Sequence, residues 1–499
     1  MSTPFAELCR LTRESALLES VESLLGWDER ALMPPAAGPY RAEQMTFLSG
    51  LVHQRRTDPR IGELLAQATA AAPSADPHGD AGATLRQLRR EYDKRIKLPQ
   101  RLVEELTRAS VLGQQAWVEA RRKNDFPAFA PHLENIVRLK REQAAAMGWQ
   151  DHPYDALLDD FEPGAKTAEL TNILAALRVE LVPLVQTIQE SSRRPDQTVL
   201  RHQFPTAGQR AFGEAAAAAI GFDFSRGRLD VTHHPFCSGM GPNDCRITTR
   251  YDEHYFPTSF FGILHESGHG IYDQGLRTDQ FGLPPGSAVS LGIHESQSRM
   301  WENQVGRSRP FWRCFLPKLQ AVLAALKDVT GDAFFFAIND VRPSLIRVEA
   351  DEATYNLHII VRFELEQALL TGDLPIRDLP AAWSDKYQQY LGIRPPSDAD
   401  GCLQDIHWSA GLFGYFPTYS LGNLYAAQFY EQADQDLGGL AEQFARGEFD
   451  ALKQWLRKNI HTHGQCYTPA ELVQRATGQP LTHAPLIRHL RGKLEPLYL

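Results

Sequence analysis

The pentapeptide His265-Glu266-Ser267-Gly268-His269 constrains the fold more than any other stretch of this 499-residue chain. Two histidines four positions apart project from one face of an α-helix, so both imidazoles can reach one metal ion. Glu266 then stands close enough to act on a water molecule bound to that ion. The flanks are apolar between positions 260 and 271, and Thr258 or Ser259 after Pro257 would suit an N-cap. We therefore expect a buried helix that carries a catalytic metal site, as in metallopeptidases.

The motif needs a third ligand, because catalytic zinc usually takes three protein ligands and leaves one position for water. The extended form HExxHxxGxxH is excluded, since Tyr272 and Gly275 occupy the positions of its glycine and last histidine. The third ligand must therefore come from another part of the chain.

A second helix is expected over residues 287–303, after the turn at 282–286. This helix carries His294 and Glu295, and the glutamate lies 26 residues after His269. That separation fits one helix, a returning loop and a second helix packed against the first. We predict that Glu295 completes a ligand set of two histidines and one glutamate. Such a set leaves zinc Lewis-acidic, so that its water can reach a pKa of about 7.

Alternatives remain for the residues around this set. Glu302 competes with Glu295 as the third ligand, and His294 could support a ligand or face the substrate. Metal-bound histidines normally hydrogen-bond through their outer nitrogen. Asp351, Glu352 or Asp273 could serve that purpose, and the sequence does not choose among them.

Composition restricts the class of partner and the surroundings of the protein. The net charge is −9 and no long basic block occurs, so nucleic-acid binding has no electrostatic support. The first 25 residues carry several charges and no segment approaches 18 apolar residues, so we expect no membrane span and a cytoplasmic location. The cysteines form no CxxC pair and are expected to be free thiols. They are Cys9, Cys237, Cys245, Cys314, Cys402 and Cys466.

Most of the chain has helical periodicity. Residues 101–124 and 167–189 carry apolar stripes, and Thr468-Pro469-Ala470-Glu471 combines a capping box with proline at the first helical position. The expected stripe of the first segment is Leu102, Leu106, Leu112, Trp117 and Val118. Chain breaks are expected at 71–82, 191–197 and 239–244, the first two as surface loops. Strand signals fall only at 229–233 and 246–251, which predicts a small sheet beside the metal helix.

Several short motifs in order resemble the M32 family of zinc carboxypeptidases, which is related in fold to neurolysin and angiotensin-converting enzyme. An early Trp27-Asp28-Glu29, followed by Met33-Pro34, is similar to the N-terminal signature of the family. Besides the HExxH motif, the matching segments are His234-Pro235-Phe236, Asp244-Cys245-Arg246-Ile247-Thr248, His294-Glu295-Ser296-Gln297, Ile346-Arg347-Val348-Glu349-Ala350-Asp351 and Gly401-Cys402-Leu403-Gln404-Asp405-Ile406-His407-Trp408.

The resemblance implies a mainly α, elongated multi-helix fold with a deep active-site groove, formed by one domain over residues 1–499. We expect an N-terminal helical part over about 1–200 and a catalytic core over about 229–425. The implied activity is release of single C-terminal amino acids from peptides with a free C-terminus, with broad specificity. The implied assembly is a homodimer. The implied cofactor is one divalent metal ion per subunit, zinc first, with cobalt able to substitute.

The resemblance also suggests roles for individual residues. Glu266 would be the general base. An arginine suits a free carboxylate because its planar fork binds both oxygens, so Arg347 is favoured for the C-terminus, with Arg246 and Thr248 lining the site. Both arginines lie close to acidic residues and could instead form structural ion pairs.

Residues 407–419 are expected to form a loop that presents hydrogen-bond donors to the carbonyl oxygen of the substrate. Tyr419 is the first choice by resemblance and His407 a second contributor, while Tyr415 could replace Tyr419. Two other functions stay open from the sequence. One is an oligopeptidase that cleaves internal bonds, and the other is an inactive peptide-binding protein.

Overall fold

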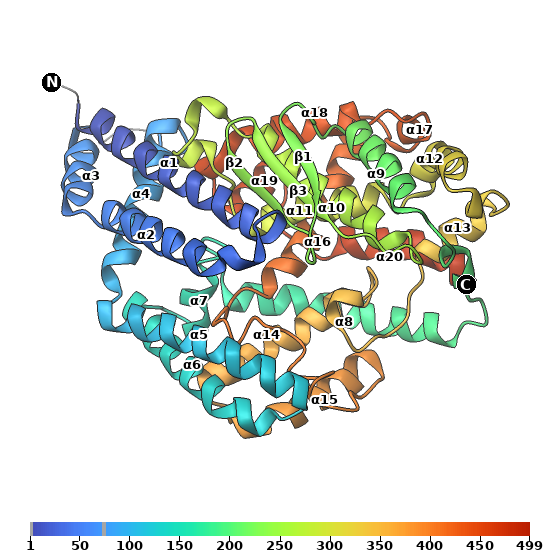
Figure 1. Ribbon diagram of the computed structural model, residues 1–499, viewed down its shortest axis with the longest axis horizontal. Coiled ribbons are helices and arrows are strands. Elements are labelled where there is room, and N and C mark those ends of the chain that lie inside the picture. Colours follow the sequence, from blue (N-terminus) through green and yellow to red (C-terminus); the bar gives the residue numbers. More distant parts are fainter. Residues whose placement is uncertain (1–2, 72–75) are drawn as a thin grey trace.

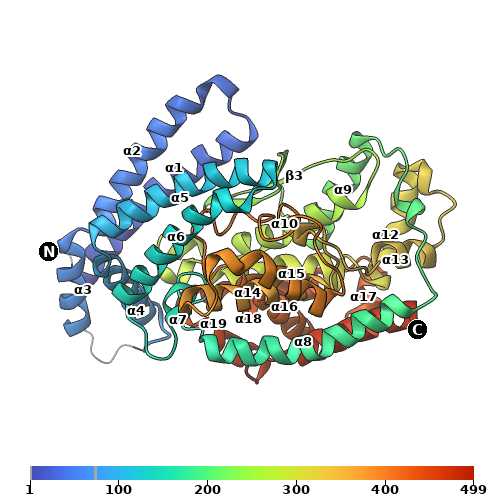
Figure 2. The same ribbon diagram turned by 90° about the horizontal axis from the view of Figure 1, so that it is seen from below.

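The protein is mainly helical, with one small sheet, as the sequence predicts. The structure is a computed structural model that describes residues 3–71 and 76–499. The expected break at 71–82 therefore lies partly outside the described residues, between α3 and α4. Figures 1 and 2 show α1 and α2 as a helical hairpin at one end of the molecule, with the sheet next to α10 and α11.

The bounds of the α-helices in the first half of the chain are α1 (Pro4–Ala31), α2 (Gly38–Arg56), α3 (Pro59–Ala71), α4 (Asp80–Lys97), α5 (Gln100–Lys123), α6 (Phe126–Met147), α7 (Pro153–Leu158), α8 (Thr167–Glu190), α9 (Thr206–Ile220) and α10 (Pro257–Gly275). Those of the second half are α11 (Leu291–Arg299), α12 (Arg309–Val322), α13 (Gly331–Ile338), α14 (Tyr355–Thr371), α15 (Leu379–Leu391), α16 (Pro417–Asp436), α17 (Ala441–Ala445), α18 (Asp450–Asn459), α19 (Pro469–Thr477) and α20 (Ala484–Tyr498). The strands are β1 (Gly227–Val231), β2 (Cys237–Gly241) and β3 (Asp244–Thr249).

The two long helices predicted from periodicity are present as α5 and α8. The stripe of α5 is narrower than predicted: Leu102 is buried, whereas Leu112 and Val118 are exposed. The predicted capping box at Thr468 is confirmed, because its side chain accepts from the backbone of Glu471 and the Glu471 side chain accepts in return. Local hydrogen bonding of this kind needs no tertiary partner, so sequence alone suffices to find it.

The sheet has the order β1-β3-β2, with β1 parallel and β2 antiparallel to β3. Both predicted strands exist, as β1 and β3. The edge strand β2 was not predicted, because three of its five residues are glycine or serine, which seldom mark a strand. The sheet packs against α10, so its predicted place beside the metal helix is confirmed.

The hairpin of α1 and α2 docks on the sheet through the predicted N-terminal motif. Trp27 is buried, and its ring lies 4.4 Å from the Arg246 guanidinium carbon and 5.3 Å from that of Arg228. Asp28 accepts a 2.7 Å hydrogen bond from Arg41 of α2, which joins the two helices. The motif near the N-terminus therefore meets β3, although more than two hundred residues separate them.

The helix predicted over 287–303 begins later and changes type. Its N-cap is Ser290, whose side chain accepts from Ile293 N, and α11 ends at Arg299. A π-helical segment, η5 (Met300–Val305), continues it. The preceding turn contains the 3₁₀ segment η4 (Pro284–Gly286). The π segment alters the direction of the side chains after Arg299, which bears on the placement of Glu302.

Candidate metal centre and active site

The helix α10 carries the pentapeptide in a buried position. It begins with Pro257 at its first position after Phe256, so the predicted cap at Thr258 or Ser259 is wrong. Proline at the first helical position costs no hydrogen bond, because the first amides of a helix have no partner within it. His265 and His269 lie on one face with ring centroids 4.9 Å apart.

Glu295 of α11 lies opposite these two histidines. Its Oε2 atom is 3.7 Å from His265 Nε2 and 3.4 Å from His269 Nε2. The ligand atoms of the three residues all lie within 4.8 Å of one another. The structure therefore brings together the three residues predicted to bind the metal, from two successive helices.

Two glycines allow this approach. A Cβ atom at Gly268 would lie 2.6 Å from both the Gln297 carbonyl oxygen and Ser298 Cα, so α11 can pack on α10 only because that atom is missing. A Cβ atom at Gly422 of α16 would lie 2.4 Å from Glu295 Cγ. Gly268 thus lets the backbone of α11 approach α10, and Gly422 leaves room for the Glu295 side chain against α16. Gly268 is one of the unspecified positions of the HExxH motif.

The outer nitrogens of both histidines are hydrogen-bonded. His265 Nδ1 lies 2.9 Å from Glu302 Oε2, and because a carboxylate only accepts, the proton sits on Nδ1 and leaves Nε2 free to bind a metal. His269 Nδ1 lies 2.6 Å from His294 Nδ1, and His294 Nε2 lies 3.0 Å from Asp273 Oδ1. The same logic makes His294 Nε2 the donor to Asp273, which leaves His294 Nδ1 to face His269 Nδ1.

The structure thus distinguishes the acidic residues that support the imidazoles from those that do not. Asp273 acts on His269 through His294, and Glu302 contacts His265 directly. Asp351 instead accepts from the backbone and hydroxyl of Thr354 at the start of α14. Glu352 pairs with Lys493 at 2.7 Å and with His489.

Arg299 was missed by the sequence reasoning. Its Nε donates to Glu295 Oε1 at 2.7 Å, which leaves Oε2 turned to the histidines, and its Nη1 lies 3.4 Å from Glu302. Its position in the sequence could have indicated this contact, because Arg299 follows Glu295 by four residues and such pairs meet on one face of a helix. Its guanidinium carbon also lies 4.5 Å from the ring centre of Tyr355.

Glu266 is buried beside the two histidines. Burial raises the pKa of its carboxyl group to about 7, and the nearby Glu295 acts in the same direction while His265 opposes it. A pKa near the operating pH suits a group that must both accept and release a proton.

Arg347 is buried next to the aromatic residues of the 407–419 segment. Its Nε and Nη2 donate to Asp405, and its Nη1 donates to Tyr355 at 2.9 Å. One N–H on each terminal nitrogen stays without a partner among the described residues, since a guanidinium has five donors. Although burial opposes it, Arg362 and Arg347 hold the pKa of Asp405 well below its usual range. Tyr355 connects Arg347 to Arg299 and hence to Glu295.

Tyr419 lies over Arg347, whose guanidinium carbon is 5.0 Å from the ring centre. Its hydroxyl is 3.3 Å from His407 Nε2, and the ring of Tyr415 is 5.4 Å away. Burial and the neighbouring Tyr355 raise the pKa of Tyr419 well above its usual value, so its hydroxyl keeps a proton to donate. Tyr419 is in the first turn of α16, so the predicted loop is wrong for its last three residues.

Arg246 and Thr248 share one face of β3, and Cys245 lies on the opposite face, toward α10. Arg246 donates twice to Asp244, at 2.8 Å each. The Thr248 hydroxyl is buried and donates within the sheet region to the carbonyl of Phe236 at 3.2 Å. No hydrogen bond joins either residue to His265, His269 or Glu295 within the described ranges 3–71 and 76–499.

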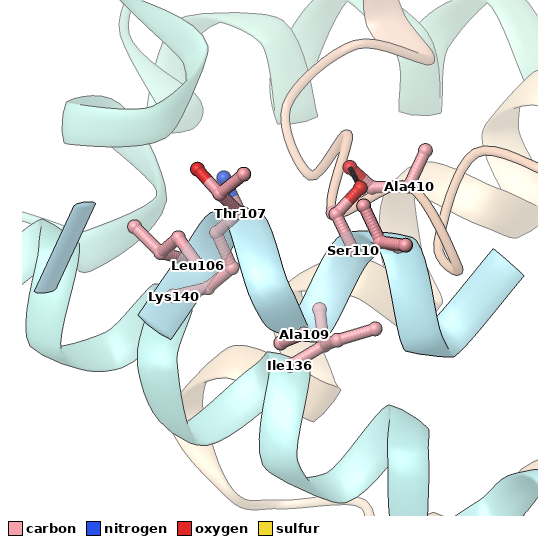
Figure 3. A pocket seen from close by; sticks show the side chains of 9 residues that line it. Leu106, Thr107, Ala109, Ser110, Ile136, Lys140 and Ala410 are labelled. Atoms are coloured by element: carbon pink, nitrogen blue, oxygen red, sulfur yellow. Dashed lines mark hydrogen bonds between the residues drawn. The ribbon is translucent and has the colours of Figure 1, made fainter. Parts of the chain in front are cut away.

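A surface cavity of about 310 Å³ lies elsewhere, between α5, α6 and the segment around Ala410 (Figure 3). Ser110 donates to the Ala410 carbonyl at its edge, and Lys140 lines it. Ala410 and Gly411 of the 407–419 segment line it, but none of the individually predicted metal-binding, catalytic or substrate-binding residues does. In the part of the chain that the structure describes, no helix has the length and apolar character needed to cross a membrane.

The fold and this arrangement define a class of protein. A helix with HExxH, completed by a glutamate from the next helix within a mainly helical molecule, is the architecture of a metallopeptidase. The model of the carboxypeptidase Taq (M32) metallopeptidase family matches residues 7–494, and this chain belongs to that family. It is a metallocarboxypeptidase, and the oligopeptidase and inactive-protein alternatives are not favoured.

Individual relatives agree over the whole length. Thermostable carboxypeptidase 1 of Thermus thermophilus is 46% identical over 503 aligned residues, which cover 99% of each chain. Carboxypeptidase 1 of Bacillus subtilis is 40% identical and covers 98% of this chain and 97% of its own. The crystal structure of the M32 carboxypeptidase from Deinococcus radiodurans superposes over all of both chains with a TM-score of 0.96 and 40% identity.

Proposed function

We propose that His265, His269 and Glu295 bind one zinc ion and that Glu266 is the general base of peptide hydrolysis. The observation that carries this proposal is the separation of 3.4 to 3.7 Å between the imidazole Nε2 atoms and Glu295 Oε2. Tetrahedral zinc with bonds of about 2.0–2.2 Å to nitrogen and oxygen separates such atoms by about 3.3–3.5 Å. When bound, the ion would polarise the peptide carbonyl and acidify water. Cobalt or manganese would fit the same donors.

Glu266 would accept a proton from the attacking water and later give it to the leaving amine. Its buried carboxylate accepts no hydrogen bond among the described residues, so it is free to bind the attacking water. A carboxyl group with a pKa near neutrality can exchange a proton in both directions at little cost.

Arg347 would bind the terminal carboxylate through its two remaining N–H groups, one on each terminal nitrogen. Asp405 and Tyr355 fix the guanidinium, so little entropy is lost on binding. Tyr419, assisted by His407, would donate to the carbonyl oxygen as negative charge develops there, and Tyr415 stays its alternative.

The central experiment follows the products of one peptide by mass spectrometry over time, with a free or an amidated C-terminus. We expect a ladder of single-residue losses from the free acid and little reaction with the amide. Glu266→Gln should keep the metal content of the wild type and lower kcat by about 10²–10⁴-fold. Internal fragments from the wild-type protein, or near-normal kcat in Glu266→Gln, would contradict the assignment.

The variants Arg347→Lys and Arg246→Lys test which arginine binds the terminal carboxylate of the substrate. Lysine keeps the charge but cannot bind a carboxylate with two parallel hydrogen bonds. Arg347→Lys should lower kcat/KM for the free acid about 10- to 100-fold, as expected for loss of a hydrogen bond to a charged group. Arg246→Lys, the matched control with its partner Asp244, should lie near the wild type. The reverse order would move the role to Arg246.

We propose further that the subunits form a homodimer and act on peptides with a free C-terminus. Support for the dimer comes from resemblance to the family, and light scattering of the purified protein at several concentrations measures it.

A further inference from the structure

Two cysteines and an aspartate form a second cluster of metal-binding groups beside the site. Cys237 of β2, Cys245 of β3 and Asp273 of α10 place their ligand atoms within 4.8 Å of one another. The two sulfur atoms are 3.6 Å apart, and Asp273 Oδ2 lies 3.9 Å from Cys237 Sγ and 4.0 Å from Cys245 Sγ. Neither cysteine takes part in the carboxypeptidase chemistry proposed above, whereas Asp273 also supports His269 through His294.

The sheet leaves room for the carboxylate between the sulfurs. Cys237 and Gly239 point to the same face of β2, and Gly239 is paired with Cys245 on β3, so both thiols face α10. A Cβ atom at Gly239 would lie 3.1 Å from Asp273 Oδ2. Because Gly239 has no side chain, the Asp273 carboxylate can lie close to the backbone of β2.

We propose that Cys237, Cys245 and Asp273 form a second divalent metal site, suited to zinc or another thiolate-binding ion. Tetrahedral zinc, with bonds of about 2.3 Å to sulfur and about 2.0–2.2 Å to oxygen, separates two sulfurs by about 3.8 Å and sulfur from oxygen by about 3.6 Å. The three separations in the structure lie within about 0.4 Å of these values. Water would fill the fourth position.

A disulfide fits the same residues less well. Cys237 pairs with Ile247 across the sheet, so Cys237 and Cys245 are diagonal neighbours. Diagonal neighbours have Cα atoms about 7–8 Å apart, whereas disulfides usually need about 4.4–6.8 Å. A disulfide would also not account for the Asp273 carboxylate close to both sulfurs.

Metal binding at this site exchanges protons for the ion. The hydrogen bond with Cys245 and burial raise the pKa of the Cys237 thiol well above its usual value, and the pKa of Cys245 is also raised. Both thiols are therefore protonated without metal, and binding forms two metal–sulfur bonds while two protons pass to solvent. Asp273 Oδ1 still accepts from His294, so the second ion would connect through Asp273 and His294 to His269.

The test loads the full, reduced chain with Co²⁺ after chelation and counts bound metal. We expect two equivalents per chain and a thiolate-to-cobalt charge-transfer absorption in the near ultraviolet. A set of two histidines and one glutamate contains no sulfur, so this band reports on the cysteine cluster alone, whatever the outcome at the first site. Cys245→Ala should lose the band and one equivalent. Cys402→Ala, which removes an equally buried cysteine elsewhere, should keep both.

The proposal is overturned if the wild-type protein binds one equivalent without a thiolate band, or if the band persists in Cys245→Ala. Should Cys245→Ala fail to fold, the wild-type spectrum decides, and Cys237→Ala repeats the comparison. Thiol titration of the denatured, unreduced protein should find all six cysteines free. A count of four with a bond between Cys237 and Cys245 would replace the metal site by a disulfide.

Discussion

At the scale of single residues, Glu295 and Glu302 contact different atoms of the histidines, although both are acidic groups in consecutive helical segments. Glu295 Oε2 faces both Nε2 atoms, whereas Glu302 Oε2 lies 2.9 Å from the Nδ1 atom of His265. The sequence favoured Glu295 but could not place Glu302. Seven residues are about two turns, so the two glutamates would share a face in a regular α-helix. The π segment that begins at Met300 changes this register, and Glu302 lies within it.

This difference predicts unequal effects of two matched substitutions. Glu295→Gln removes the charge of the proposed third ligand and should abolish stoichiometric metal binding at micromolar protein. Glu302→Gln should keep binding but weaken it about 10- to 100-fold, the usual cost of losing a group that supports a ligand histidine. Competition with a chelator of known affinity measures both. Equal losses in the two variants would show that Glu302 is itself a ligand.

At the scale of elements, the centre depends on how closely α10 and α11 pack. Periodicity predicted α5 and α8, the capping box predicted α19, and the HExxH motif with its apolar flanks predicted α10, because these signals are local. The start of α11 was placed four residues early, since the turn before it continues through η4 and ends at the Ser290 cap. The strand β2 escaped prediction because its pairing with β3, and not its composition, makes it a strand.

The close packing predicts opposite outcomes for two glycine substitutions within α10. In Gly268→Ala the new Cβ atom would lie 2.6 Å from the backbone of α11, so the helices must separate and Glu295 must withdraw. We expect lower thermal stability and at least about tenfold weaker metal binding. In Gly262→Ala the nearest atom would be Thr249 Oγ1 at 3.5 Å, an ordinary contact. That variant should gain about 0.5–1 kcal/mol from helix propensity.

Thermal melts with and without added zinc, and the same chelator competition, compare these two variants. Wild-type metal affinity in Gly268→Ala would mean that the distance between α10 and α11 does not control the site.

At the scale of the whole molecule, the active centre joins segments that sequence motifs identify but cannot bring together. Arg347 precedes α14 and Asp405 follows α15, yet they form a buried pair, and Tyr355 connects Arg347 with Arg299. The Trp27 ring contacts Arg246 of β3, although most of the N-terminal half of the sequence lies between them. Each motif was recognisable alone. Their contacts depend on the packing of the large common core, which no local pattern encodes.

Long-range packing also buries His461, which joins the C-terminal region to α10. Its Nε2 lies 2.9 Å from Gln297 Oε1, and a Cβ atom at Gly275 would lie 2.3 Å from its Nδ1. Burial, with smaller contributions from Arg457 and His294, lowers the pKa of His461 from 6.5 to about 3. Between pH 6.5 and about pH 3, His461 is protonated in the unfolded chain but neutral in the folded protein. Stability from this group is thus complete above about pH 6.5 and is lost progressively as the pH falls toward about 3.

The slope of that loss is about 1.4 kcal/mol per pH unit. Glutamine at position 461 is neutral at every pH, so His461→Gln should be less stable than the wild type near neutrality through lost packing, and this deficit should shrink steadily below about pH 6.5. Buried carboxyl groups such as Glu162 and Glu366, whose pKa values burial raises to about 7, act in the opposite direction in both proteins. Their contribution cancels in the difference between the two unfolding free energies. A deficit that stays constant between about pH 7 and pH 5 would show that His461 is protonated to the same extent in the folded and unfolded states.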